Sequence, residues 1–320
     1  MPTQKTLLQI VQQAQRELGL AITTDVVGAT DQTTVQMYGY ANQEIEELRQ
    51  RHTWTALQRE YNLVVSPPTI TTGDITENSA VISNIPDTSA LTAQYFMVAG
   101  DSIPAAARIQ SVDSPTQITM TMEATGTTVG AELTFSQDTY PEPSDFNSFL
   151  NRTWWDRTNR WELLGPDSPQ LDQWHRSGIV TTGPRRHFRQ LGWLGNTYRI
   201  WPPPAEITDP LQLVFEYLSN QCVFLNGNVA TTSTQFENNN DQPILNDRAV
   251  ILGIKWRFWE QKGFDWVQKR TDYDNYVERL MARDGGAQTL SMVKRVNPIF
   301  ISPANVQDGF FPGPVGPNMG

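Results

Sequence analysis

Cysteine and histidine are scarce in this sequence of 320 residues, which holds one cysteine, Cys222, and three histidines. A single cysteine excludes a disulfide within the chain and fits a protein made in a reducing cytosol. Catalysis of the Ser-His-Asp or Cys-His type has little material here, and no cysteine and histidine stand at metal-ligand spacing. Walker-type loops, GxGxxG turns, GxSxG elbows, HExxH motifs and EF-hand loops are missing as well. We therefore expect no enzyme, no cofactor and no metal site.

Long apolar runs and basic clusters are also lacking. No run approaches the roughly 20 apolar residues of a membrane helix, and the first residues lack the apolar core of a secretory signal, so we expect no membrane span. The formal net charge is −10. Because clustered Lys and Arg carry sequence-independent binding to DNA and to anionic membranes, this charge argues against both.

Apolar residues recur at helical spacing near both ends of the sequence. The stripe over residues 7–18 predicts a helix that stops at Gly19, and Asp31 is the predicted N-cap of a second helix that packs on the first. Toward the other end, residues 244–286 predict one long helix bent at Gly263, or two consecutive helices. These elements together predict a helical bundle.

Three further stretches, outside residues 68–140, are predicted to be strands. Apolar and polar residues alternate over residues 57–65, which predicts a strand that follows the second helix. Residues 196–205 and 211–225 are predicted to form a hairpin or a small sheet.

Residues 68–140 differ abruptly in composition from the rest. They lack lysine and carry eight acids against one base, Arg108, a net charge of −7. Short runs rich in Thr, Val and Ile, separated by turn residues, predict an all-β sandwich or barrel of five to seven strands. The sequences before and after it are alike, so it is interpreted as an insertion into one domain. We expect an α+β protein with a body over residues 1–67 and 141–289, an inserted acidic β module over 68–140, and an arm over 290–320.

The expected arm contains five prolines and four glycines from residue 290 onward and has no helical or strand period. One interpretation is a frayed terminus. The other is an extended arm that docks on a neighbouring subunit through its apolar anchors. These anchors are Phe300, Ile301, Phe310 and Phe311.

Residues 151–174, "NRTWWDRTNRWELLGPDSPQLDQW", are termed the tryptophan segment because they hold four of the ten tryptophans. Trp and Arg are enriched at binding hot spots, so the segment is interpreted as an interface with another subunit or tail protein. A buried core, stacking on single-stranded nucleic acid and glycan binding are the alternatives. The candidate interface residues are Trp154, Trp155, Arg157, Arg160, Trp161 and Trp174.

Several of these stretches resemble the head-to-tail adaptor proteins of short-tailed bacteriophages, the tail tubular protein A type. The most telling are "WDRTNRWELLGPDSP" and "LGIKWRFWEQKG". The resemblance covers most of residues 4–286 outside the β module. It extends over "LLQIVQQAQRELGL", "VVGATDQTTVQMYGYANQEIEELRQRHTWTAL" and "YRIWPPPAEITDPLQLVFEYLSN".

The resemblance implies a structural virion protein of the phage neck or tail, made in the host cytoplasm. It implies a homododecameric ring that joins the portal protein to the tail nozzle protein and forms part of the DNA ejection channel. Genomic DNA would pass an acidic wall without specific binding. The arm would reach the portal, and the β module would be a spacer or a docking surface for tail fibres. The alternative is a receptor-binding or glycan-binding tail module.

Overall fold

A computed structural model of the protein describes residues 4–177, 186–192, 195–203 and 209–285. These residues form five α-helices and several antiparallel sheets, so the expected α+β class is confirmed at this level. The predicted arm, with Phe300, Ile301, Phe310 and Phe311, lies outside the described residues. Among the residues that are described, no helix is both long and apolar enough to cross a membrane.

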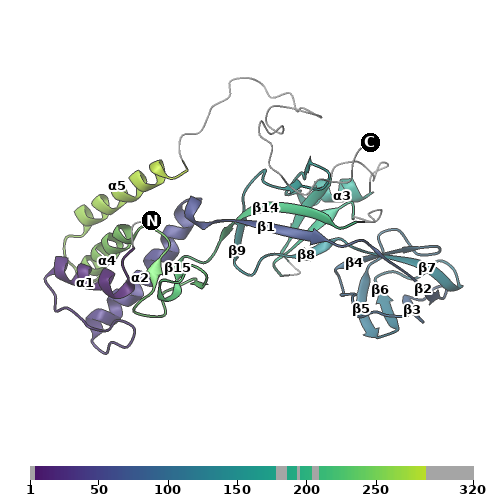
Figure 1. The fold of residues 1–320 in the computed structure, drawn as a ribbon, viewed down its shortest axis with the longest axis horizontal. Helices are drawn as coiled ribbons and strands as arrows, with labels where there is room; N and C mark the ends of the chain where they lie inside the picture. Colours follow the sequence, from purple (N-terminus) through teal and green to yellow (C-terminus); the bar gives the residue numbers. More distant parts are fainter. Residues whose placement is uncertain (1–3, 178–185, 193–194, 204–208, 286–320) are drawn as a thin grey trace, which may run out of the picture. The chain divides into compact units, whose positions relative to one another are not determined.

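Helices from the two ends of the described chain pack around one apolar core (Figure 1). The first helix stops, and the second helix starts, where the sequence predicts. Gly19 ends the first helix with a left-handed φ of 70°. The Asp31 carboxylate caps the second helix by accepting a 2.9 Å hydrogen bond from the Thr34 backbone N–H. These helices are α1 (Leu7–Leu18) and α2 (Gln32–Arg51).

The C-terminal pair consists of two consecutive helices, α4 (Asp247–Gln261) and α5 (Val267–Arg283). The sequence allowed either one bent helix or two, and the chain breaks at Gly263, whose φ of 73° glycine adopts without strain. Apolar stripes on all four helices supply the core. Its buried members include Leu7, Ile10, Val11, Ala14, Ala41, Ile45, Leu48, Val250, Ile254, Phe258, Tyr273 and Val277.

An ion pair is buried inside this helical core. Arg257 of α4 donates hydrogen bonds to Glu44 and, at 2.7 Å, to Glu47, both on α2. Gly253 lies one turn before Arg257, and a Cβ at that position would overlap the Glu44 carboxyl group. The sequence therefore places glycine where α4 must approach an acidic side chain closely.

Residues 69–137 form a six-stranded antiparallel sheet with an apolar core of its own (Figure 1). The strand order is β4-β7-β2-β3-β6-β5. A bridge between Met97 and Arg108 joins β4 to the residues just before β5, the strand at the other end of this order. The strands are β2 (Thr69–Ile75), β3 (Val81–Ser83), β4 (Phe96–Gly100), β5 (Ile109–Ser114), β6 (Gln117–Met120) and β7 (Thr128–Gln137).

Three further antiparallel sheets use the remaining strands. The largest has the order β1-β14-β10-β11, with β9 also paired to β14, and the others are β12-β13-β8 and β16-β15-β17. Side chains of the first two share one aromatic core. The strands are β1 (Gln58–Val65), β8 (Thr139–Pro141), β9 (Phe146–Phe149), β10 (Trp155–Asp156), β11 (Trp161–Glu162), β12 (His187–Leu191), β13 (Thr197–Trp201), β14 (Leu211–Ser219), β15 (Val223–Phe224), β16 (Thr232–Ser233) and β17 (Gln242–Pro243).

The predicted pairing of residues 196–205 with residues 211–225 is wrong. β13 and β14 belong to different sheets. β1 offers β14 a complete partner, with an unbroken register from Gln58↔Leu218 to Val65↔Leu211, while β13 pairs with β12 and β8. β13 thus pairs with the strand before it in sequence, which is the usual arrangement, whereas the partner of β14 lies far away in sequence.

Candidate functional site

The tryptophan segment folds as a short hairpin followed by a helix. β10 and β11 pair through Trp155↔Glu162 and Asp156↔Trp161. The Asp156 carboxylate closes the turn between them by accepting a 2.9 Å hydrogen bond from the Asn159 backbone N–H. After the hairpin, Pro169–Ser177 form helix α3. The segment is thus a defined part of the body with a hairpin and a helix that can carry exposed side chains.

Trp154 fixes the tryptophan segment to the aromatic core of the body. Its ring is stacked between Phe188, at a centroid distance of 4.1 Å, and Phe215, at 4.0 Å, and it is 1% exposed. A side chain enclosed in this way has no surface for a partner. Trp154 therefore belongs to the core, and the expectation that it contacts another subunit is corrected. A stretch dense in aromatic residues contains both buried and exposed tryptophans.

The other tryptophans of the segment differ in exposure. Trp155, the first residue of β10, is 37% exposed. Trp174, on α3, is 68% exposed, and Trp161 is half-buried. Among the tryptophans of the segment, Trp155 and Trp174 are therefore the ones with most surface to offer.

The two arginines of the predicted interface lie at the hairpin turn. The Arg157 guanidinium donates a 2.8 Å hydrogen bond to Glu60 on β1, and both side chains are half exposed. Arg160 is exposed and has a left-handed φ of 61°. Both charged groups thus remain within reach of a partner.

A network of arginines and aspartates holds α3 against the sheet behind it. Buried Asp172 of α3 accepts a 2.6 Å hydrogen bond from Arg189 and lies 3.9 Å from Arg199. Arg199 also approaches Asp138, 3.5 Å away, which binds Arg108 of the β module. Burial, with the charge of Arg108, lowers the pKa of Arg199 to about 10. No sequence motif indicated this network, because its five members come from separate segments between residues 108 and 199.

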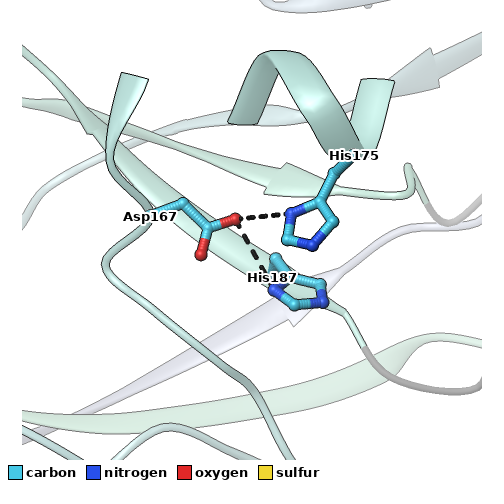
Figure 2. A group of neighbouring side chains, drawn as sticks. All are labelled: Asp167, His175 and His187. Atoms are coloured by element: carbon cyan, nitrogen blue, oxygen red, sulfur yellow. Dashed lines mark hydrogen bonds and ion pairs between the residues drawn. The ribbon is translucent and has the colours of Figure 1, made fainter. Parts of the chain in front are cut away.

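A second cluster joins Asp167, His175 and His187 (Figure 2). Asp167 lies within the "GPDSP" stretch, His175 on α3, and His187 at the first position of β12. The Asp167 Oδ2 atom is 3.0 Å from His175 Nδ1 and 3.5 Å from His187 Nδ1. Burial lowers the pKa of His187, while the charge of Asp167 acts in the opposite direction. These three side chains can hold a proton or a cation.

The sequence interpretation missed this cluster. The separations of 8 and 12 residues fit no metal or catalytic motif, and the three residues meet only because the chain reverses between the hairpin, α3 and β12. The only weak signal was that two of the three histidines stand near the same aspartate-rich stretch.

Cys222 is a poor candidate nucleophile. It is buried, and burial raises the pKa of its thiol to about 12, with the charge of Arg49 acting in the opposite direction. Reactive cysteines have lowered pKa values and accessible sulfur atoms. The Cys222 thiol instead donates a hydrogen bond to the Thr234 carbonyl at 3.2 Å, which is a structural role.

Comparison with known proteins assigns the chain to no group: no family model and no curated protein matches its sequence.

Proposed function

We propose that this protein is a head-to-tail adaptor of a short-tailed bacteriophage, a subunit of a homododecameric ring that joins the portal to the tail nozzle. The observation that carries the proposal is the tryptophan segment. Trp155 and Trp174 are exposed on a hairpin and a helix that buried Trp154 and Asp172 hold from beneath. Large aromatic side chains on a fixed support are the usual anchors of protein interfaces. The resemblance of the segment to adaptor sequences supports the same conclusion.

In this proposal each part of the fold has its own role. The four helices of the shared core form the bundle of the adaptor body, residues 1–67 and 141–289. Residues 68–140 form an inserted barrel that docks tail fibres, and the Met97–Arg108 bridge favours a closed barrel over an open sheet. Residues 290–320 form the arm that reaches the portal.

The charge of the protein supports a role in DNA passage. The net charge is −10, and a channel wall that repels phosphate lets the genome slide without binding. In this proposal the ring is part of the ejection channel and resides in the virion, and DNA passes it without specific contacts.

The test is negative-stain imaging of the purified protein mixed with the portal protein of the same virus. We expect a ring stacked coaxially on the portal. Free monomers beside bare portals would refute the adaptor function, and a glycan screen would then examine the receptor-binding alternative.

Two variants and one control make the imaging specific. Trp174→Ala should reduce the fraction of portals that carry a ring, and deletion of residues 290–320 should weaken attachment. Val129→Ala removes an apolar side chain of the β module that is 82% exposed, more than the 68% of Trp174, and should leave ring formation unchanged. Equal ring formation by Trp174→Ala and Val129→Ala would exclude Trp174 from the interface.

A further inference from the structure

The Asp167, His175 and His187 side chains present three metal-ligating atoms at one point. One such atom of each residue lies within 4.8 Å of those of the other two. Figure 2 shows both imidazoles turning a nitrogen toward the same carboxylate oxygen. Zinc bonds of about 2.0–2.1 Å in a tetrahedral site place ligand atoms about 3.3 Å apart. The observed separations of 3.0 and 3.5 Å from the Asp167 oxygen already bracket that value.

The backbone fixes two of the ligands next to each other. The Asp167 backbone N–H donates a 2.9 Å hydrogen bond to the Phe188 carbonyl, and the Phe188 N–H donates one of 2.9 Å to the Leu164 carbonyl. The stretch that carries Asp167 therefore runs alongside the start of β12, where His187 lies. The third ligand, His175, lies on α3, which Asp172 and Arg189 hold in place. A preformed arrangement of this kind lowers the ordering cost of binding an ion.

Hydrogen bonding alone leaves the cluster incomplete. His175 Nδ1 makes a 3.0 Å hydrogen bond with Asp167, but the buried Nδ1 atom of His187 has no hydrogen-bond partner among the described residues. A buried nitrogen without a partner costs free energy, and a cation placed between the three side chains would accept its lone pair.

The neighbouring arginines are matched by other acids. Arg186 precedes His187 and lies 3.5 Å from Asp156, and Arg176 follows His175 and lies 4.0 Å from Asp172. The carboxylate of Asp167 is therefore left to the two imidazoles. One carboxylate with two neutral imidazoles gives a site of net charge −1, which suits a divalent cation.

We propose that Asp167, His175 and His187 bind a divalent transition-metal ion, with zinc as the cation best suited to them. Two imidazole nitrogens and one carboxylate oxygen form a donor set that zinc favours, whereas calcium and magnesium require oxygen ligands. Three protein ligands leave a coordination position for water or for a partner's side chain. The ion clamps α3, which carries exposed Trp174, to β12. This inference does not depend on the proposed adaptor function.

The test is isothermal titration of zinc chloride into the full-length protein, without a histidine tag and after treatment with a chelator. We expect one zinc ion per chain. His175→Ala and His187→Ala should each weaken binding by at least about tenfold, the lower end of the loss seen even for residues behind the ligands. His52→Ala is the matched control, because His52 lies outside the cluster and pairs with one aspartate, Asp284, at a distance of 3.6 Å. This variant should bind zinc as the wild type does.

Asp167→Asn keeps the test decisive if a histidine variant fails to fold. This variant retains the shape of the side chain and loses its charge. We expect zinc to raise the unfolding temperature of the wild type and to raise that of Asp167→Asn much less. Absence of zinc binding by the wild type, or equal binding by the wild type and the cluster variants, would overturn the proposal and leave a His–Asp hydrogen bond as the whole role of the cluster.

Discussion

The Tyr273 hydroxyl donates a 2.5 Å hydrogen bond to the Glu44 carboxylate, which links α5 to α2 inside the helical core. The same carboxylate pairs with Arg257 of α4. The two consecutive C-terminal helices and the distant α2 therefore meet at one acidic side chain. Glu44 is fully buried, while Glu47, which binds the same arginine, has a side chain that is 42% exposed.

This difference in burial predicts unequal effects of two similar substitutions. Glu44→Gln leaves the buried Arg257 charge without its inner partner and should cost about 3 kcal/mol of unfolding free energy. Glu47→Gln removes an ion pair that water screens and should cost less than about 1 kcal/mol. Urea unfolding of both variants measures the two losses. Equal losses would contradict the importance of the inner pair.

Trp154 and Trp174 offer a second matched pair within the tryptophan segment. Trp154→Ala removes a ring packed between Phe188 and Phe215 and should cost about 3–5 kcal/mol. Trp174→Ala acts on a side chain that is 68% exposed and should change stability by no more than about 0.5 kcal/mol. Thermal unfolding compares the two. A large loss for Trp174→Ala would show that α3 buries this ring in solution.

Gly165, the one glycine of the tryptophan segment, should tolerate no side chain. Its φ is 149°, and a Cβ would lie 2.5 Å from the Phe188 carbonyl oxygen. Gly165→Ala should therefore destabilise the protein by at least about 1–3 kcal/mol, as measured by urea unfolding. Gly39→Ala is the control of opposite sign: Gly39 is exposed on α2, a Cβ there would meet no other atom within 4 Å, and alanine should stabilise by about 0.5–1 kcal/mol.

Glu17 predicts a pH dependence of stability. Burial raises the pKa of Glu17, but hydrogen bonds from Arg248 and Lys255 outweigh that effect and lower the pKa from 4.5 to about 2. A carboxyl whose pKa is lower in the folded state stabilises the protein above pH 4.5, and this contribution disappears as the pH falls toward 2. Glu17→Gln should flatten the loss of unfolding free energy across that window. Urea unfolding at a series of pH values would contradict this if both proteins had the same slope.

The helices and the number of strands in the β module were predictable because both depend on local signals. The stripe that ends at Gly19, the Asp31 cap and the break at Gly263 all appear in the structure as the sequence indicates. Such signals act within a few residues, so no knowledge of the rest of the fold was needed.

Strand partners and the three-residue cluster were not predictable, because they depend on which distant segments meet. β14 has the same apolar sequence whether it pairs with its neighbour β13 or with the distant β1, and the observed partner is β1. Asp167 and His187 converge because the stretch from Leu164 to Asp167 bonds to the start of β12, and α3 adds His175. Likewise, the sequence "TWWD" does not tell which tryptophan faces inward, since that depends on the side of β14 that is covered.

The core shared by helices from both ends of the chain has a consequence for synthesis of the protein. Glu44 and Arg257 are 213 residues apart, so at a translation rate of about 5–20 residues per second the first is made roughly 10–40 seconds before the second. The strands of residues 69–137 lie close in sequence and can pair within that interval. Nascent chains that end before α4 lack the helices that complete the core around the apolar faces of α1 and α2.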